Sequence, residues 1–380
     1  MDEAYHPGLE GVLAAETEIS YLDVEQESIL IRGYDLIELA NHVTYLDVAY
    51  LLWHGDLPSE GERATLEQEL AATQMLPNGI LTILKALGPE VHTMDALRTG
   101  ISALSAFDVE GGGGSGVEAA DRQLISLWAK MPALLGESYR IKHALAPMQA
   151  GQGASYVERL LWQVTGRPPS ALEIDVFDKL LTLYSEHEMP NSTFSARVIA
   201  STLSDVYGVL AGAAASLKGP LHGGANEAVM RMLLEEVVNP NAMAPYLKAK
   251  LQAKARIMGF GHRVYMHRPD PRAMMMKRLL GELVEAKGAS VSKAHDLVAM
   301  CQIGEDVMRQ EKGLFANLDY YAAPVYYLLG VPTELFTPIF FAARMAGLSA
   351  HIREQYGNNR LYRPRVRYVG ARGRTLPPRE

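Results

Sequence analysis

The segment Lys218-Gly-Pro-Leu-His-Gly-Gly-Ala-Asn226 is one of two glycine- and proline-rich breaks in a chain whose pattern is otherwise helical. The second break is Met258-Gly-Phe-Gly-His-Arg-Val-Tyr265, which continues to Asp270-Pro-Arg272. Each break places one histidine, His222 or His262, on a loop or helix end among glycines, which permit unusual backbone angles and close approach of a ligand. Because functional side chains concentrate on loops held by a rigid scaffold, these two histidines are the first candidates for chemistry.

Helical signals dominate the sequence on both sides of these breaks. Ser170 with Glu173, for example, forms a capping box that opens a helix. Strand signals are concentrated near the N-terminus, where Glu18–Leu22 and Ser28–Gly33 flank a polar turn and predict a small β-hairpin. The sequence therefore predicts an all-α fold with one short hairpin.

A long helix is expected from Ser192 or Thr193 to about Leu217. Its second half, Gly208–Ala215, consists mainly of glycine and alanine, whose small side chains let another helix approach closely. Tight packing within the core and a buried helix at a dimer interface both explain this composition, and the sequence leaves the two open.

The chain has 380 residues, of which 48% are hydrophobic. This length exceeds the roughly 250–300 residues at which one core stops growing, so a large and a smaller domain are expected. The single cysteine, Cys301, excludes an internal disulfide and fits a reducing cytoplasm. The acidic N-terminus lacks the features of a signal peptide, and no apolar run approaches the roughly 18 residues that cross a bilayer. We therefore expect a cytoplasmic protein without a membrane segment.

The formal net charge of −8 argues against nucleic-acid binding. From His351 to Glu380, however, eight arginines stand against two glutamates, so this segment carries 8 − 2 = +6. A local arginine cluster in an acidic protein suggests a site for small polyanions. Arg372, Arg374 and Arg379 are interpreted instead as part of a solvated tail.

Two other kinds of site fit poorly. The histidines show neither His-Glu-x-x-His spacing nor clustered cysteines, so we expect no metal site; His187-Glu188 and the pair His262 and His267 are weak candidates. The glycine run within Glu110–Gly116 lacks the Gly-Lys-Ser/Thr of a phosphate-binding loop and follows a predicted helix, so it is interpreted as a surface loop.

Three segments together resemble the signature segments of citrate synthases. In the family's order they are Gly219–Asn226, Gly259–Tyr265 with Asp270–Arg272, and Asn317-Leu-Asp-Tyr320. The similarity extends from about Pro7 to Gly370. It implies an all-α, citrate-synthase-like fold of two domains, with a large dimerisation domain at 1–223 and 327–380 and a small domain at 224–326 that closes over the active site.

The resemblance also implies a catalytic trio. Asp319 would remove a proton from the carbon beside a thioester carbonyl, and His222 would donate a hydrogen bond to the developing enolate oxygen, because so weak a carbon acid needs both. His262 would hydrogen-bond or protonate the carbonyl of oxaloacetate as the carbon–carbon bond forms. Hydrolysis of the resulting thioester would release coenzyme A (CoA). Asp319 is also placed to be a helix N-cap, which is compatible with the catalytic role.

Substrate contacts follow from the same resemblance. Oxaloacetate is a small dianion, and arginine matches carboxylates bidentately. Arg344 lies in an apolar predicted helix, Ile339–Ala350, where a charge is seldom unpaired. The expected oxaloacetate contacts are His187, Arg272, Arg344 and Arg363, with Arg363 coming from the neighbouring subunit of a homodimer. The expected CoA contacts are Leu221, Gly259, Phe260, Gly261, Arg263, Arg268, Asn317 and Arg360. No tightly bound cofactor is expected, since the CoA thioester is a substrate.

The acyl group is predicted from positions interpreted as the rim of the pocket, namely Pro190, Tyr321 and Leu348. These residues resemble bacterial 2-methylcitrate synthases, which use propionyl-CoA and usually accept acetyl-CoA. An ordinary citrate synthase specific for acetyl-CoA is the alternative, because one methylene is worth only about 1–3 kcal/mol in a hydrophobic pocket. An inactive relative with a binding role and a metal-dependent hydrolase or lyase are less favoured alternatives.

Overall fold

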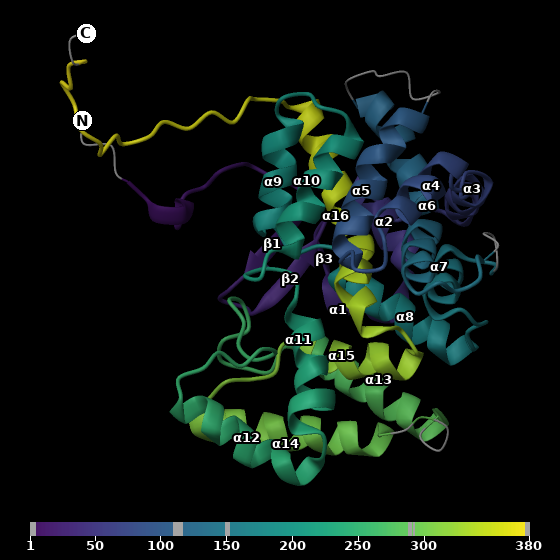
Figure 1. Ribbon diagram of the computed structural model, residues 1–380, viewed down its shortest axis with the longest axis vertical. Coiled ribbons are helices and arrows are strands. Elements are labelled where there is room, and N and C mark those ends of the chain that lie inside the picture. The colour runs from purple at the N-terminus through teal and green to yellow at the C-terminus, as the bar shows by residue number, and fades with distance from the viewer. Residues whose placement is uncertain (1–4, 109–116, 149–152, 288–290, 292, 377–380) are drawn as a thin grey trace.

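The computed structural model describes residues 5–108, 117–148, 153–287, 291 and 293–376. Helices make up the body of this part of the chain, with short strands near the N-terminus, as Figure 1 shows. The all-α class predicted from the sequence is therefore confirmed. The predicted surface loop at Glu110–Gly116 lies outside the described residues.

The helices divide conveniently at His222. Before it come η1 (Pro7–Leu9), α1 (Leu36–His42), α2 (Tyr45–His54), α3 (Glu60–Ala72), α4 (Asn78–Ala86), α5 (Thr93–Leu104), η2 (Ser105–Phe107), α6 (Val117–Lys142), α7 (Tyr156–Thr165), α8 (Ala171–Tyr184), α9 (Asn191–Ala200) and α10 (Val206–Lys218). After it come α11 (Ala225–Arg231), η3 (Met232–Val237), α12 (Pro240–Gln252), α13 (Pro271–Lys287), α14 (Ala294–Lys312), α15 (Leu318–Leu329), η4 (Thr333–Leu335) and α16 (Phe336–Gly357).

The predicted hairpin is present and is part of a slightly larger sheet. Strands β1 (Ser20–Asp23) and β2 (Ser28–Ile31) pair antiparallel, with Ser20 opposite Ile31. A third strand, β3 (Tyr34–Asp35), which the sequence did not predict, pairs with β2. Gly33 adopts φ +86°, a left-handed conformation that glycine tolerates without strain, so the chain turns at once from β2 into β3.

The predicted long helix from residue 192 to 217 is two helices, α9 and α10. The chain breaks because Asp205 caps α10, where its side chain accepts a hydrogen bond from the Gly208 N–H at 2.9 Å. A Cβ atom added to Gly212 would lie 2.2 Å from Cδ1 of Ile199 in α9, so glycine here permits the close approach of the two helices. Tight packing within the chain thus accounts for this glycine, while the dimer-interface interpretation stays a prediction.

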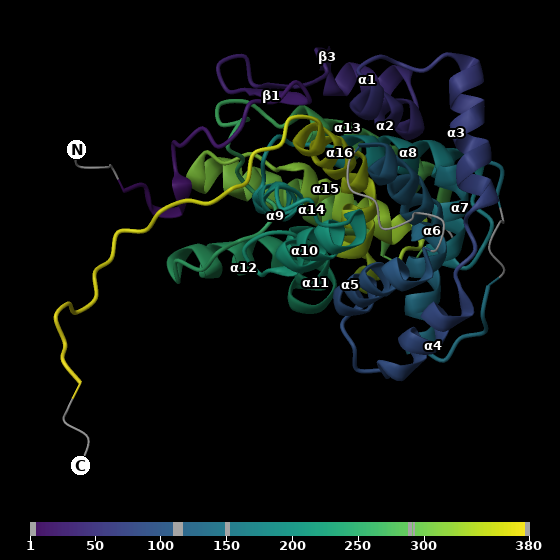
Figure 2. The ribbon, with the colours of Figure 1, turned by 90° about the horizontal axis from the view of Figure 1, so that it is seen from above.

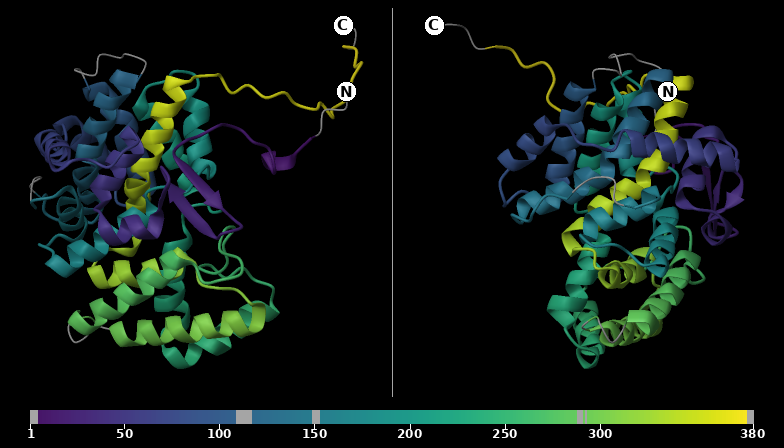
Figure 3. Two further views of the ribbon diagram at one scale, coloured as in Figure 1. Left: turned by 180° about the vertical axis from the view of Figure 1, so that it is seen from behind. Right: turned by 90° about the vertical axis from the view of Figure 1, so that its right-hand side faces the viewer.

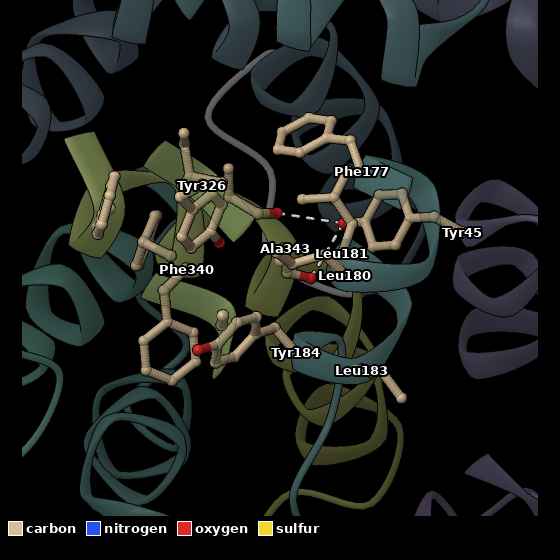
Figure 4. Close-up of a cluster of buried hydrophobic side chains, with 14 of the residues drawn as sticks. Tyr45, Phe177, Leu180, Leu181, Leu183, Tyr184, Tyr326, Phe340 and Ala343 are labelled. Atoms are coloured by element: carbon tan, nitrogen blue, oxygen red, sulfur yellow. Dashed lines mark hydrogen bonds between the residues drawn. The ribbon is translucent and has the colours of Figure 1, made fainter. Parts of the chain in front are cut away.

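Helix α16 forms the centre of the core. The Tyr45 hydroxyl of α2 donates to the carbonyls of Ala342 and Ala343 in α16, at 3.1 and 3.0 Å. Figure 4 shows this contact beside apolar side chains of α8, and the rings of Tyr184 and Phe340, whose centroids are 4.7 Å apart. The span Thr333–Gly357 is long and apolar enough to cross a membrane by those two criteria alone, but its most apolar stretch is entirely buried inside the molecule.

Helices α11 to α15 gather at one end of the molecule, below the helices that surround α16 in Figures 1 and 3. The division into domains at 1–223 with 327–380 and at 224–326 remains a prediction. At the opposite end, the segments 5–16 and 359–376 extend away from the body, as Figures 1 and 2 show. They meet where the Arg367 guanidinium lies 4.8 Å from the Tyr5 ring centroid.

Candidate active site

His262 lies in the loop between α12 and α13, and hydrogen bonds attach this loop to the chain before α15. The Asn317 N–H donates to the Gly259 carbonyl, and the Gly261 N–H donates to the Phe315 carbonyl, both at 2.9 Å. Gly259 has φ +90°, and a Cβ atom added to it would lie 2.8 Å from the Tyr320 ring. Only glycine fits this backbone, so the glycine context does position His262 against α15.

The main chain selects the tautomer of His262. The N–H groups of Val264 and Tyr265 point to its Nδ1 atom, at 3.1 and 3.3 Å. Nδ1 must therefore be the acceptor, and in a neutral imidazole Nε2 carries the proton. Burial, followed by the charge of Arg272, lowers the pKa of His262 to about 4, so the ring is neutral at physiological pH.

Two further side chains meet His262 at Nε2. The Arg272 Nη2 atom lies 2.9 Å away and the His187 Nε2 atom 3.1 Å away. Burial, and then the charges of Arg272 and Arg344, hold the pKa of His187 well below its usual range. Because a guanidinium has no acceptor, the Arg272 contact opposes a proton on Nε2, whereas the two main-chain N–H groups at Nδ1 favour it. A carbonyl or carboxylate oxygen placed between the two side chains would accept from both and remove that opposition.

His222 follows α10, and its ring is tied to the first turn of α9. The Ser192 N–H donates to His222 Nε2 at 3.2 Å, and the Ser192 hydroxyl lies 2.8 Å from the same atom. The first N–H groups of a helix have no partner within it, so Ser192 is free to make this bond. Nε2 is then the acceptor and Nδ1 carries the proton. Burial and the charge of Arg344 lower the pKa of His222 to about 4.

Asp319 lies in the first turn of α15. It is not the N-cap that the sequence suggested: Asn317 occupies that position, and no side chain caps the helix. The Tyr184 hydroxyl donates to Asp319 Oδ1 at 2.6 Å. Burial raises the pKa of Asp319, the Tyr184 hydrogen bond and the charge of Arg272 lower it, and the net shift is upward. The carboxyl group is consequently a stronger base than an exposed aspartate, yet its ionised form has a hydrogen-bond donor.

Arg272 is held by Asp270, a carboxylate that is 1% exposed. Asp270 Oδ1 accepts from Arg272 Nε at 3.0 Å, and Oδ2 accepts from Nη2 at 2.8 Å. The Leu318 N–H, at the start of α15, also donates to Oδ2, at 3.2 Å. Asp270 therefore links the arginine to the helix that carries Asp319.

Arg344 is buried in α16. Its Nε atom donates to the Tyr184 carbonyl at 2.7 Å, and its guanidinium lies 4.9 Å from the centroid of the Phe340 ring. Burial lowers the pKa of Arg344 to about 10. Within the described part of the chain, no carboxylate lies at ion-pair distance from it, so the charge suits an anionic ligand.

Other predicted contacts are not brought together in this chain. Arg363 and Arg360 are exposed on the extended C-terminal segment, and Leu221 is 86% exposed. Arg263 is exposed, and Arg268 forms an ion pair with Glu27 instead of standing free.

Two of the predicted CoA contacts are already engaged. The Asn317 side chain donates to the Gly261 carbonyl at 3.1 Å, and the Phe260 ring packs 4.4 Å from that of Tyr320.

The positions interpreted as the pocket rim are mostly interior. Tyr321 is 1% exposed and its hydroxyl donates to Glu305 at 2.5 Å, while Leu348 is fully buried in α16. Helix packing encloses both side chains, so neither lies at an exposed rim, and their part in the choice of acyl group stays a prediction. Pro190 is the N-cap residue of α9, immediately before the turn that binds His222.

Four residues that contact the site were missed as partners, namely Glu27, Tyr184, Ser192 and Asp270. Ser192 was predicted as the start of a helix. Asp270 lies in the signature segment Asp270–Arg272, two residues before Arg272. Tyr184 and Glu27 carry no sequence signal, because each contacts its partner across a long stretch of chain: Tyr184 binds Asp319 135 positions away, and Glu27 binds Met266 239 positions away. In the described residues, no group of three or more His, Cys, Asp or Glu side chains could hold a metal ion.

Sequence comparison identifies relatives along nearly the whole chain. The family model "Citrate synthase, C-terminal domain" matches residues 8–365. The citrate/2-methylcitrate synthase of Bacillus subtilis is 53% identical, with 98% of each chain covered. The citrate synthase of Heyndrickxia coagulans is 51% identical, with 96% of each chain covered.

Solved structures agree. The citrate synthase of Pyrobaculum aerophilum has a TM-score of 0.88 at 34% identity, covering 98% of this chain and 94% of that one. The citrate synthase of Thermoplasma acidophilum, solved with carboxymethyl coenzyme A and oxaloacetate, has a TM-score of 0.90 at 29% identity, covering 99% of each chain. With the signature segments in order, the fold shared and the relatives matched end to end, this chain belongs to the citrate synthase family.

Proposed function

We propose that this protein is an acyltransferase that condenses an acyl-CoA with oxaloacetate and water and releases CoA. Propionyl-CoA is the favoured substrate, giving 2-methylcitrate, and acetyl-CoA is also accepted, giving citrate. Family membership supports the reaction. The observation that carries it is the pair of neutral histidines, His222 and His262, each with one ring nitrogen bound by main-chain N–H groups and the other carrying a proton.

Asp319 is the proposed base. It would take a proton from the carbon beside the thioester carbonyl, while the Nδ1–H of His222 donates to the oxygen that becomes the enolate oxygen. A hydrogen-bond donor aimed at developing charge in a buried site stabilises the transition state. A neutral imidazole is suited to this donor role. The lowered pKa of His222 keeps its ring in that neutral form.

The second half of the reaction would use the oxaloacetate site. Arg272 and Arg344 are proposed to bind its carboxylates, with His187 as a further contact. The Nε2–H of His262 would donate to the ketone oxygen, which becomes an alkoxide as the enolate carbon attacks and then takes up a proton. Water would finally cleave the thioester.

A homodimer completes the proposal. Arg363 is exposed on a segment that leaves the body of its own chain, so it is free to reach the site of a second copy. The same exposure leaves Arg360 and Arg263 available for CoA phosphates. A cytoplasmic location fits the single buried cysteine.

Two relatives bear on the choice of acyl group. The Bacillus subtilis relative is named for both products, which supports a propionyl-CoA enzyme that accepts acetyl-CoA. The Heyndrickxia coagulans relative is named for citrate alone, which supports an enzyme specific for acetyl-CoA as the alternative.

Steady-state kinetics with both acyl-CoAs and oxaloacetate tests the proposal, with Asp319→Ala as the diagnostic variant. A general base contributes typically about 10²–10⁴-fold, so this variant should lose at least that much turnover while calorimetry still detects oxaloacetate binding. Asp306→Ala, a partly exposed aspartate in α14, is the matched control. Near-normal turnover by Asp319→Ala would exclude Asp319 as the base, and a higher kcat/KM for acetyl-CoA would favour the alternative substrate.

A further inference from the structure

Four successive N–H groups in the His262 loop bind mainly to two side chains, and the Met266 N–H also approaches the Val264 carbonyl at 3.1 Å. Those of Val264 and Tyr265 point to His262 Nδ1. Those of Met266 and His267 donate to one carboxylate oxygen, Oε1 of Glu27, at 2.9 and 2.7 Å. The peptide groups that define the tautomer of His262 are therefore continuous with peptide groups fixed by Glu27.

Glu27 comes from a distant part of the chain, the turn between β1 and β2. Its side chain is buried, and its backbone has φ +48°, so the turn is shaped to aim this residue inward. Its second oxygen, Oε2, lies 3.0 Å from Arg268 Nε. The Arg268 Nη2 atom in turn donates to the carbonyl of Gln26 at 2.7 Å and to that of Glu27. The hairpin turn thus contacts both the backbone of the loop and the side chain of Arg268, which belongs to the loop.

The rest of the loop is anchored elsewhere. At its start, Gly259 and Gly261 hydrogen-bond to the chain before α15. At its end, Asp270 holds Arg272. Between these anchors, the Glu27 carboxylate supplies the side-chain acceptor for the main chain at residues 266 and 267, so it restrains the stretch nearest to the N–H groups that bind His262.

We propose that Glu27 is a positioning residue for the condensation: by fixing the backbone at residues 266 and 267, it keeps the preceding N–H groups on His262 Nδ1 and so keeps the proton on Nε2. This inference rests on the proposed function, in which the Nε2–H donates to the ketone oxygen. Glu27 itself touches neither the imidazole nor the substrate.

Loss of the carboxylate should reduce turnover more than substrate binding. Without it, the His267 N–H loses its acceptor and the Met266 N–H keeps only the Val264 carbonyl, so the peptide groups at 264 and 265 are less restrained. His262 can then place its proton on Nδ1, which removes the donor from the ketone oxygen as charge develops there. The arginines that bind the carboxylates of oxaloacetate have their own partners and remain in place.

The test uses three variants of Glu27 and one control. Glu27→Ala removes the acceptor, and kcat should fall by about 10- to 100-fold, the effect of a small misplacement of a reacting group. The KM for oxaloacetate should change less than about threefold, within the spread expected when substrate binding is retained. Glu27→Gln keeps an oxygen acceptor and should stay within about threefold of wild-type kcat, since neutral acceptors still bind N–H groups. Glu25→Ala removes an exposed glutamate of the same turn and should change neither constant.

The outcomes separate this inference from the proposed function. Wild-type protein that does not condense either acyl-CoA with oxaloacetate would contradict the function itself. If the wild type is active, a Glu27→Ala kcat within threefold of it, or equal losses in Glu27→Ala and Glu27→Gln, would overturn the role of Glu27. A change confined to the KM for acyl-CoA would also overturn it. Should Glu27→Ala fail to fold, Glu27→Asp, whose carboxylate is one methylene too short to reach both N–H groups, must lower kcat in its place.

Discussion

Replacing Asp270 with asparagine would remove the charge from a carboxylate that is almost fully buried and that contacts Arg272 at 2.8 and 3.0 Å. Arg272 is itself 4% exposed, so in the variant its positive charge would have no buried counterion in Asp270. Breaking a buried ion pair by removing one partner costs about 3–5 kcal/mol. Because the asparagine oxygen can still accept one of the N–H bonds, we expect the lower end, a loss of about 3 kcal/mol in the free energy of unfolding.

Urea unfolding followed by circular dichroism measures this loss. Asp306→Asn is the matched control, because Asp306 pairs with Arg309 at 3.0 Å while the two side chains are 41% and 57% exposed. An exposed pair contributes no more than about 1 kcal/mol, so this control should change stability only slightly. The KM for oxaloacetate should also rise in Asp270→Asn, since Asp270 orients the guanidinium. A loss below about 1 kcal/mol, equal to that of the control, would refute the conclusion that Asp270 supports a buried charge.

Three further predictions concern the base, the dimer and metals. Tyr184→Phe removes a hydrogen bond that lowers the pKa of Asp319, so the pKa rises further and the acid limb of kcat should move to higher pH; an unmoved limb would show that Asp319 does not titrate there. Arg363→Ala and Asp319→Ala are each expected to be inactive alone, but heterodimers of the two variants should regain activity. If Arg363 acts in the partner's site, such a heterodimer contains one site with native Asp319 from one subunit and native Arg363 from the other. No recovery in verified heterodimers would place Arg363 in its own site. Chelation should leave turnover unchanged, and its loss would instead support a metal-dependent reaction.

The sequence predicted the fold class because local rules were strong and consistent. The capping box at Ser170 is present with both of its hydrogen bonds, and the hairpin begins at Ser28 on its second strand as expected. Errors arose where one side chain interrupts a regular pattern. Asp205 caps α10 and divides a predicted helix. Strand β3 has only two residues, too few to show a strand pattern in the sequence, and it forms because the chain turns at Gly33.

The sequence was less informative about what surrounds the candidate trio. Glycine context selected His222 and His262, and the family motif selected Asp319. A Cβ atom would clash at Gly223 and at Gly259, whereas Gly224 has open space around it. The sequence could not show that Arg268 pairs with Glu27 or that Tyr184 binds Asp319, because those contacts join residues 241 and 135 positions apart. Contacts of this kind depend on the packing of whole helices and are not encoded in any local spacing.

The two histidines share a feature that no side-chain motif could reveal. In each ring, one nitrogen accepts main-chain N–H groups, from Ser192 for His222 and from Val264 and Tyr265 for His262. An imidazolium ion carries a proton on both nitrogens, so protonation would set N–H against N–H in both places. This opposition acts in the same direction as burial, which lowers both pKa values to about 4. The backbone thus favours both the neutral form of each ring and the nitrogen that carries its proton, so substitutions that move the backbone, and not only those that remove a histidine, should abolish the proposed donors.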